Sequence, residues 1–302
     1  MTDVVIKGFV AGAGSAFRFP TPDIHRVTLT RVEISGCYCT EDAYGGTIRE
    51  NGGTRTALTL IDCNIHHNLS SCGGGVYWNA SGRTQAVCTI KGTTQIHDNT
   101  ALKNGVGVYG ETRVVLEENV RIYNNEAQYG AGIYLRSYGA DDAAFDGQGF
   151  SLEIKNNVQV DNNTAGVYGG GICLRIINAP AIGYAPNGTA LASQTYSFTI
   201  SDGSIHDNEA PKGAGVAILD LATMKNKVDN VSTNEIIRTV TMTGGSVYGN
   251  TTTGTGQTGA GIYIRKYPAA YLNEASDPEY NPVEDYSLSY YGGAGTITVT
   301  AS

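Results

Sequence analysis

The stretch VVLEENVRIYNN at 114–125, followed by GAGIY at 130–134, is one copy of a two-part repeat. The first phrase returns as LTLIDCNIHHN (58–68), CTIKGTTQIHDN (88–99), LEIKNNVQVDNN (152–163), FTISDGSIHDN (198–208) and VTMTGGSVYGN (240–250). The second follows each as GGGVY (73–77), GVGVY (105–109), GGGIC (169–173), GAGVA (213–217) and GAGIY (259–263). Both phrases alternate apolar and polar residues, which is the period of a β-strand.

The spacing of the repeats predicts the architecture. Asn99 and Asn125 are 26 positions apart and Asn163 and Asn208 are 45 apart, and almost all of the variation follows the second phrase. This favours a coil of fixed size with an expandable loop at one corner. One coil cannot bury its own apolar face, so neighbouring coils must stack, at about 4.8 Å in parallel pairing. We therefore predict one all-β domain over 1–302, a single-stranded right-handed parallel β-helix of about seven complete coils.

The ends of the repeat are irregular. A degenerate copy over 27–49 has Cys37 where the other copies have Asn, and partial turns lie at 4–17 and 295–301. Met1 leads straight into strand-like residues, so no signal peptide is visible. Because uncapped coils expose strand edges, we expect flanking domains or further coils in a longer chain.

One column of residues is predicted to hold the coils together. Stacking brings the final residue of each first phrase into line, and a column of amides can hydrogen-bond from coil to coil. The residues are Asn68, Asn99, Asn125, Asn163, Asn208 and Asn250. The glycines of the second phrase supply the corner, since Gly tolerates positive φ and close backbone approach. No helix follows GxG, so the phrase is not a phosphate loop, and no cofactor is expected.

Composition limits the partners. The net charge is −8 with a pI near 5.1, which disfavours nucleic acid because such binding needs a clustered basic surface. No run of about 18 apolar residues occurs, so no membrane span is expected. Six cysteines form no metal pattern. Cys63 and Cys88 occupy apolar positions of the repeat, whereas a disulfide among Cys37, Cys39 and Cys72 is left open.

The two phrases resemble the GGA[ILV] and FxxN repeats of polymorphic outer-membrane proteins and related bacterial adhesins. They are also similar to the IxxNxA…GGGIY repeats of large surface proteins from gut bacteria and archaea. The resemblance covers roughly residues 27–265, with Ile or Val where the outer-membrane family has Phe. It implies a right-handed parallel β-helix displayed outside the cell, at its surface, and attached to a host or polysaccharide partner.

Enzymes share this fold, so their motifs were sought. The polygalacturonase motifs NTD, GHG and RIK do not occur, and Asp141-Asp142 lies in an expected loop. Few acids occupy strand positions, so neither a six-oxygen calcium site nor the carboxylate pair of a glycosidase is visible. The sequence offers no positive case for catalysis.

Columns of side chains that point outward after the GxG corner are the first candidate site. Alternation places one column at Arg49, Tyr77, Tyr109, Tyr134, Cys173, Ala217 and Tyr263, and a second at Asn51, Asn79, Glu111, Arg136, Arg175, Leu219 and Arg265. Tyrosine faces beside arginines suit the C–H faces and carboxylates of acidic sugars. We predict the ligand-binding residues Tyr77, Tyr109, Tyr134, Arg136, Arg175, Tyr263 and Arg265. The alternative is that the tyrosines only stabilise the solenoid by packing between strands.

Loops at the same corner lengthen along the chain, at 79–87, 110–113, 137–151, 176–197, 220–239 and 266–294. Loops on one face of a repeat array commonly form its binding face. The Tyr-rich insertion 266–294 is the longest, and a groove between these loops and the columns is the preferred site. The alternative is that its tyrosines only anchor the loop.

A weaker candidate is a metal site at His66 and His97, which lie on adjacent coils and share a column with His206. Other polar residues fill this column elsewhere, so exposed ladder residues are the default interpretation and no metal is expected.

Three functions remain open. The leading hypothesis is a non-enzymatic adhesin module that binds a glycan or another cell-surface polymer. The alternatives are a polysaccharide lyase or glycoside hydrolase on the same solenoid, and a passive stalk.

Overall fold

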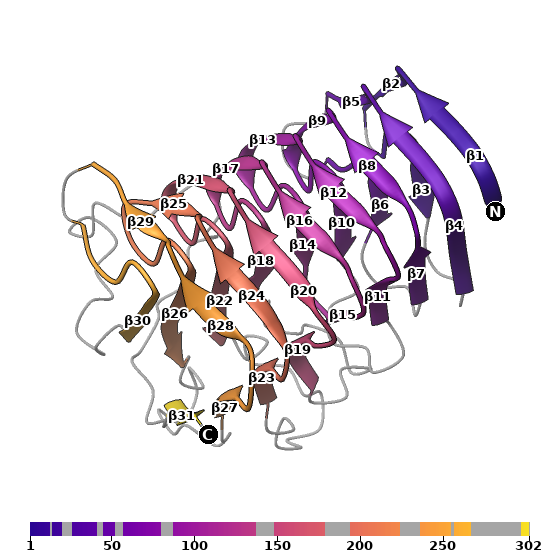
Figure 1. Cartoon of the computed structure of the whole chain (residues 1–302). Helices are drawn as coiled ribbons and strands as arrows, with labels where there is room; N and C mark the ends of the chain where they lie inside the picture. Colours follow the sequence, from indigo (N-terminus) through magenta and orange to yellow (C-terminus); the bar gives the residue numbers. More distant parts are fainter. Residues whose placement is uncertain are drawn as a thin grey trace, which may run out of the picture.

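The computed structural model of the chain describes residues 1–12, 14–19, 26–40, 45–51, 57–79, 87–136, 148–178, 194–223, 236–254, 257–266 and 297–301. Within these ranges the regular elements are all β-strands, and every strand pair is parallel. Figure 1 shows the strands side by side along one axis, in three long sheets. The expected all-β solenoid, a parallel β-helix, is therefore confirmed.

Two of the sheets have eight strands each, one strand from each coil. We call the first sheet B; its strands are β2 (Val10–Ala11), β5 (Tyr38–Cys39), β9 (Leu69–Cys72), β13 (Thr100–Asn104), β17 (Glu126–Tyr129), β21 (Thr164–Tyr168), β25 (Glu209–Ala210) and β29 (Thr251–Thr252). Sheet C consists of β3 (Phe17–Phe19), β6 (Ile48–Asn51), β10 (Val76–Asn79), β14 (Val108–Gly110), β18 (Ile133–Arg136), β22 (Ile172–Asn178), β26 (Val216–Thr223) and β30 (Ile262–Lys266).

The third sheet, sheet A, has two arms that share one long strand. The first half of β4 (Arg26–Ser35) begins one row of strands, the lower arm, and its second half begins another row, the upper arm. β1 (Thr2–Lys7) pairs with the other side of β4. The lower arm contains β7 (Ala57–Ile61), β11 (Val87–Lys91), β15 (Arg113–Leu116), β19 (Gln148–Ile154), β23 (Gln194–Ile200), β27 (Ile236–Met242) and β31 (Ile297–Ala301). The upper arm contains β8 (Asn64–His66), β12 (Gln95–His97), β16 (Arg121–Tyr123), β20 (Val158–Asp161), β24 (Gly203–His206) and β28 (Ser246–Tyr248).

The coil count follows from this order. Seven coils, from β4–β5–β6 to β27–β28–β29–β30, contribute to sheets B and C and to both arms of sheet A. The ends are partial turns: β1–β2–β3, in which β1 pairs only with residues 30–35 of β4, and the single strand β31. The expected number of coils and both expected partial turns are confirmed. The expandable segments follow sheet C and precede sheet A in each coil, as predicted. Apart from residues 110–113, most of each predicted loop, including nearly all of 266–294, lies outside the described residues.

The core is one continuous apolar column. The inward-pointing apolar residues of each phrase stack on their equivalents in the next coil, as Ile65 does on Ile96 and Val76 on Val108. Cys63 and Cys88 belong to this cluster, so their reading as small apolar residues is confirmed. All six cysteines are buried free thiols, which settles the open disulfide among Cys37, Cys39 and Cys72 in favour of none.

The Asn column is a continuous ladder of hydrogen bonds. In Asn99, for example, Nδ2 donates to Oδ1 of Asn125 at 3.0 Å and to the backbone oxygen of Ile65 at 3.1 Å. The same pair of bonds recurs from Asn68 to Asn208. At the degenerate copy, Cys37 still donates its backbone N–H to Oδ1 of Asn68 at 2.9 Å. Buried amides are thus satisfied by their equivalents in adjacent coils.

The residue before each Asn adopts a left-handed conformation. Its φ lies between 50° and 63° in every coil, and the residues are His67, Asp98, Asn124, Asn162, Asp207 and Gly249. Asn, Asp, His and Gly are the residues that tolerate this region best. The turn therefore explains why these residue types precede the ladder.

Candidate functional site

The predicted columns on sheet C are in register. Tyr77 pairs with Tyr109, Tyr109 with Tyr134, and the series continues through Cys173 and Ala217 to Tyr263. These side chains point away from the core and form a second cluster of their own. The expected stacking is confirmed by ring centroids 4.5 Å apart for Tyr77–Tyr109 and 5.3 Å for Tyr109–Tyr134.

The expected exposure of this column is wrong at its first three tyrosines. Tyr77 and Tyr109 are 1% exposed, Tyr134 is 0% exposed, and Arg136 of the second column is 4% exposed. Their faces are covered by each other and by the opposite side of the corner, where Cys72, Tyr129 and Tyr168 of sheet B join the same cluster. Alternation along a strand gives the direction of a side chain, but the angle between two sheets decides whether it reaches water.

In two coils the sides of the GxG corner have complementary sizes. Sheet B supplies Cys72 and Tyr168 before the turn, and sheet C supplies Tyr77 and Cys173 after it in the same coils. In a third coil both sides carry rings, Tyr129 and Tyr134, which pack in the same cluster. This packing favours a structural role for the buried tyrosines over a role in contacting a surface ligand.

A charged group is buried beside this tyrosine stack. The Tyr109 hydroxyl donates to Oε1 of Glu111 at 2.8 Å, and Nε of Arg136 lies 3.7 Å from the same oxygen. The side chains of Glu111 and Arg136 are 2% and 4% exposed. Burial raises the pKa of Tyr109 well above its usual value, so its proton stays available for the carboxylate.

The C-terminal part of the same corner is more open. Tyr263, Arg175 and Arg265 are half-buried, as is Lys212, which forms an isolated bridge with Tyr168. Three of these residues contact the ring of Tyr168: Lys212 Nζ lies 5.4 Å from its centroid, Arg265 Nη1 donates to its hydroxyl at 3.1 Å, and Tyr263 stacks on it at 6.0 Å. The structure therefore brings the predicted Tyr263 and Arg265 together with two residues that the sequence did not single out.

This patch, defined here as the corner patch (Tyr168, Arg175, Lys212, Tyr263 and Arg265), combines three cations with the half-buried ring of Tyr263, which lies beside the buried ring of Tyr168. The Arg175 charge also acts on the neighbouring Cys173, but burial dominates and raises the pKa of that thiol to about 12. The corner patch thus gathers three cationic side chains in a chain whose net charge is −8. Such a surface suits an anionic ligand with an apolar face.

The predicted histidine column lies on the upper arm of sheet A. His66, His97 and Tyr123 stack as parallel rings, with centroids 5.0 Å and 4.6 Å apart. His206 stacks on Tyr248 further along at 4.8 Å. Because the rings cover one another's faces, the column presents ring edges to solvent.

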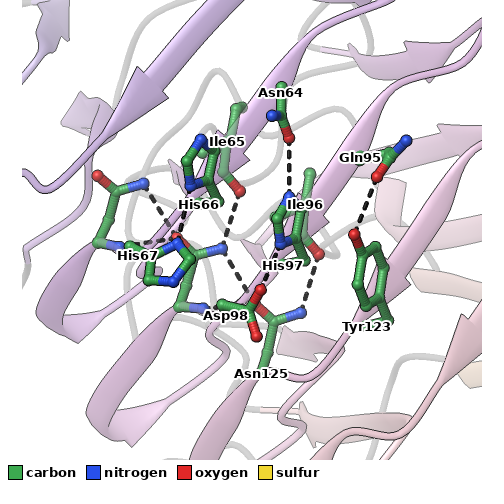
Figure 2. A network of polar contacts seen from close by, with 12 residues as sticks. Asn64, Ile65, His66, His67, Gln95, Ile96, His97, Asp98, Tyr123 and Asn125 are labelled. Atoms are coloured by element: carbon green, nitrogen blue, oxygen red, sulfur yellow. Dashed lines mark hydrogen bonds and ion pairs between the residues drawn. The ribbon is translucent and has the colours of Figure 1, made fainter. Parts of the chain in front are cut away.

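Each ring also contacts a polar residue of the preceding coil (Figure 2). His97 Nε2 lies 2.9 Å from Oδ1 of Asn64, and the Tyr123 hydroxyl donates to Oε1 of Gln95 at 2.9 Å. His66 makes the equivalent contact with the coil before it, where its Nε2 lies 3.4 Å from Oε1 of Glu33. These bonds confirm that the column is a ladder of polar residues.

The proposed sharing of a metal by His66 and His97 does not fit this geometry. Their rings are within 6° of parallel, and both nitrogens of His97 are already engaged, Nδ1 with Asp98 at 2.6 Å and Nε2 with Asn64. Parallel stacked rings cannot aim their lone pairs at one point. Across the described part of the chain, no group of three or more His, Cys, Asp or Glu side chains converges as metal ligands do.

Comparison with protein-family models, with curated proteins and with solved structures finds no match for this chain. Among the described residues there is also no helix with the length and hydropathy needed to cross a membrane. The repeat and its corner patch are therefore the basis for any functional proposal.

Proposed function

We propose that the chain is a non-enzymatic binding module of an extracellular cell-surface protein, which recognises an acidic glycan or another anionic cell-surface polymer. The observation that supports it is the corner patch, where Lys212 and Arg265 both contact Tyr168. A sugar ring can lie on an aromatic face while its carboxylate accepts hydrogen bonds from a cation. The repeat's resemblance to surface adhesins points in the same direction.

The form of the solenoid favours a polymer over a small molecule. The corner runs along the axis of the molecule, and coils follow one another at about 4.8 Å. Arg175 and Arg265 are therefore two coils apart on one line, with Leu219 between them. A long anionic chain placed along the corner could contact both Arg175 and Arg265, and its binding would weaken as salt concentration rises.

Binding to a panel of acidic and neutral polysaccharides tests the proposal. Tyr109 and Arg136 are buried, so variants there would report stability, and the double variant Lys212→Gln/Arg265→Gln is the appropriate probe. Each charge-assisted hydrogen bond contributes about 1.5–3 kcal/mol, so we expect affinity for an acidic polymer to fall at least about tenfold. The matched control is Lys155→Gln, whose ammonium pairs with Glu117 on sheet A.

Two outcomes would contradict the proposal. Equal affinity of the double variant and the control would remove the corner patch as the binding site. Release of reducing ends or of unsaturated products from any polysaccharide would show that the module is an enzyme.

The enzyme alternative has one observation in its favour. Glu111 is a buried carboxyl that contacts both a tyrosine hydroxyl and an arginine, and acids held in such surroundings are common in active sites. A polysaccharide lyase or glycoside hydrolase would use it as an acid or base. In that case Glu111→Gln would abolish turnover while the protein stays folded.

A further inference from the structure

The side chains of His66 and His67 meet at the end of β8. Their Nδ1 atoms are 2.8 Å apart, and their rings are inclined at 84° with centroids 5.0 Å apart. The left-handed conformation of His67, at φ 52°, brings these adjacent side chains together, although neighbours in an extended strand point to opposite faces. His67 is exposed and His66 is half-buried, and Figure 2 shows both rings near Asp98.

The contacts of His66 define where its proton lies. Nε2 lies 3.4 Å from Oε1 of Glu33, a carboxylate that also pairs with Lys7 at 2.8 Å. A neutral ring that donates from Nε2 has its lone pair on Nδ1. His67 must then hold the proton between the two Nδ1 atoms.

We propose that His66 and His67 form a two-nitrogen site for a divalent transition-metal ion of the copper–nickel type. Two ligands at about 2.0 Å and a right angle, as in tetragonal Cu(II) or Ni(II), are about 2.8 Å apart, whereas a tetrahedral angle places them about 3.3 Å apart. The two Nδ1 atoms are 2.8 Å apart and joined by a hydrogen bond, so a change of ring orientation, without backbone movement, can direct both lone pairs to one ion.

Little rearrangement is needed for an ion to enter. His67 is exposed, so its proton can pass through water from Nδ1 to Nε2, and rotation about its Cβ–Cγ bond then turns the freed Nδ1 lone pair toward a shared ion. Water fills the remaining positions. Glu33 holds Nε2 of His66, the arrangement in which a carboxylate orients a metal-binding imidazole and raises its basicity. The carboxylate of Asp98, close by, adds negative charge.

Titration with Cu(II) and Ni(II) at neutral pH tests the site, with calorimetry for stoichiometry and electron paramagnetic resonance of bound Cu(II) for its nitrogen ligands. We expect one ion per chain, bound more tightly for Cu(II) than for Ni(II). His66→Gln and His67→Gln should each weaken binding by about tenfold or more, and Glu33→Gln by about tenfold. The copper spectrum should show two coupled nitrogens, and one in each His variant.

The matched control is His206→Gln. His206 lies in the same column with a ring partner, Tyr248, and an acid, Asp207 at 2.8 Å, but it has no adjacent histidine. Its replacement should leave affinity unchanged, and an unchanged melting temperature of each variant would show that the fold is intact. Unchanged binding in both His66→Gln and His67→Gln, or no stoichiometric binding to the unmodified chain, would overturn the proposal.

Discussion

The carboxamide oxygen of Asn163 accepts two hydrogen bonds from Asn125, one from its backbone N–H at 3.1 Å and one from its Nδ2 at 3.0 Å. One side chain thus satisfies a buried turn in the neighbouring coil. Asn163 Nδ2 in turn donates to the backbone oxygen of Ile122 and to Asn208. In addition to strand pairing, Asn163 therefore links its coil by hydrogen bonds to the coil before it and to the coil after it.

Removal of a central amide should be costly. Asn163→Ala leaves the N–H and Nδ2 of Asn125 without their acceptor in a buried turn, and we expect a loss of about 2–4 kcal/mol in the free energy of unfolding. Asn250→Ala at the half-buried last rung should lose less, because water can replace its contacts. Urea denaturation measures both, and equal losses would show that the ladder contributes no more in the centre than at its end.

Completion of the ladder should stabilise the first coils. Asn68 donates to the Ile34 oxygen, and Ile34 pairs in register with Ile6, so an amide at position 37 would reach the oxygen of Ile6. We expect Cys37→Asn to raise the free energy of unfolding by about 0.5–1.5 kcal/mol. The control Cys88→Asn places an amide in the apolar core and should destabilise the protein by about 2 kcal/mol or more. A lower melting temperature for Cys37→Asn would contradict the expectation.

Coil spacing leaves no room for a side chain at the second glycine of the GxG corner. A Cβ on Gly132 would lie 2.5 Å from the Gly171 oxygen and 2.9 Å from Val160 Cγ1, so Gly132→Ala should destabilise the fold by about 1–3 kcal/mol. Gly12→Ala, where a Cβ would have no neighbour within 4 Å, should change stability by less than about 0.5 kcal/mol. Thermal unfolding of the two variants measures this difference, and equal melting temperatures would show that the corner tolerates a side chain at position 132.

The buried hydroxyl of Tyr109 should matter for stability. Tyr109→Phe removes a hydrogen bond from the buried Glu111 carboxylate, and we expect a loss of about 1–3 kcal/mol. The control is Tyr123→Phe, whose hydroxyl donates to Gln95 at the surface and should be worth less than about 0.5 kcal/mol. Similar stabilities in chemical denaturation would argue against a structural role for the Glu111 contact.

Stability should fall on mild acidification. The pKa of His66 is lowered from the ordinary histidine value of 6.5, first by burial and then by the neighbouring His97 and His67, although Glu33 opposes this shift. The unfolded chain therefore binds a proton at higher pH than the folded chain does, and stability declines as pH falls below about 6.5. The melting temperature between about pH 5 and 7 should change less steeply in His66→Gln. An identical slope in both proteins would assign the effect to other groups.

The architecture could be predicted from the sequence because equivalent residues of the repeat stack on one another in the fold. The alternation around Ile96 and Val108 gave the direction of each side chain, and the recurrence of Asn99 and Asn125 gave the stacking. Even the Cys37 substitution was placed correctly in its column. The direction and the stacking of a side chain depend on the equivalent residue of the next coil, and aligning the repeats identifies that residue.

Exposure and local turn geometry were not accessible in the same way. Tyr134 was expected at the surface, yet it is buried because the outer sides of sheets B and C face each other across the corner. The contact between His66 and His67 was missed because strand alternation separates adjacent side chains. The recurring His, Asp, Asn or Gly before the ladder Asn was the available signal, since these residues favour positive φ.

The Asn ladder also makes the length of the molecule independent of the length of its chain. Asn99 and Asn125 are 26 positions apart and Asn163 and Asn208 are 45 apart, yet each interval advances the ladder by one rung with bonds of 3.0 Å. Residues added between two rungs therefore do not extend the ladder. The span of the solenoid depends on the number of rungs, so the sequence between rungs can vary in length while that span stays constant.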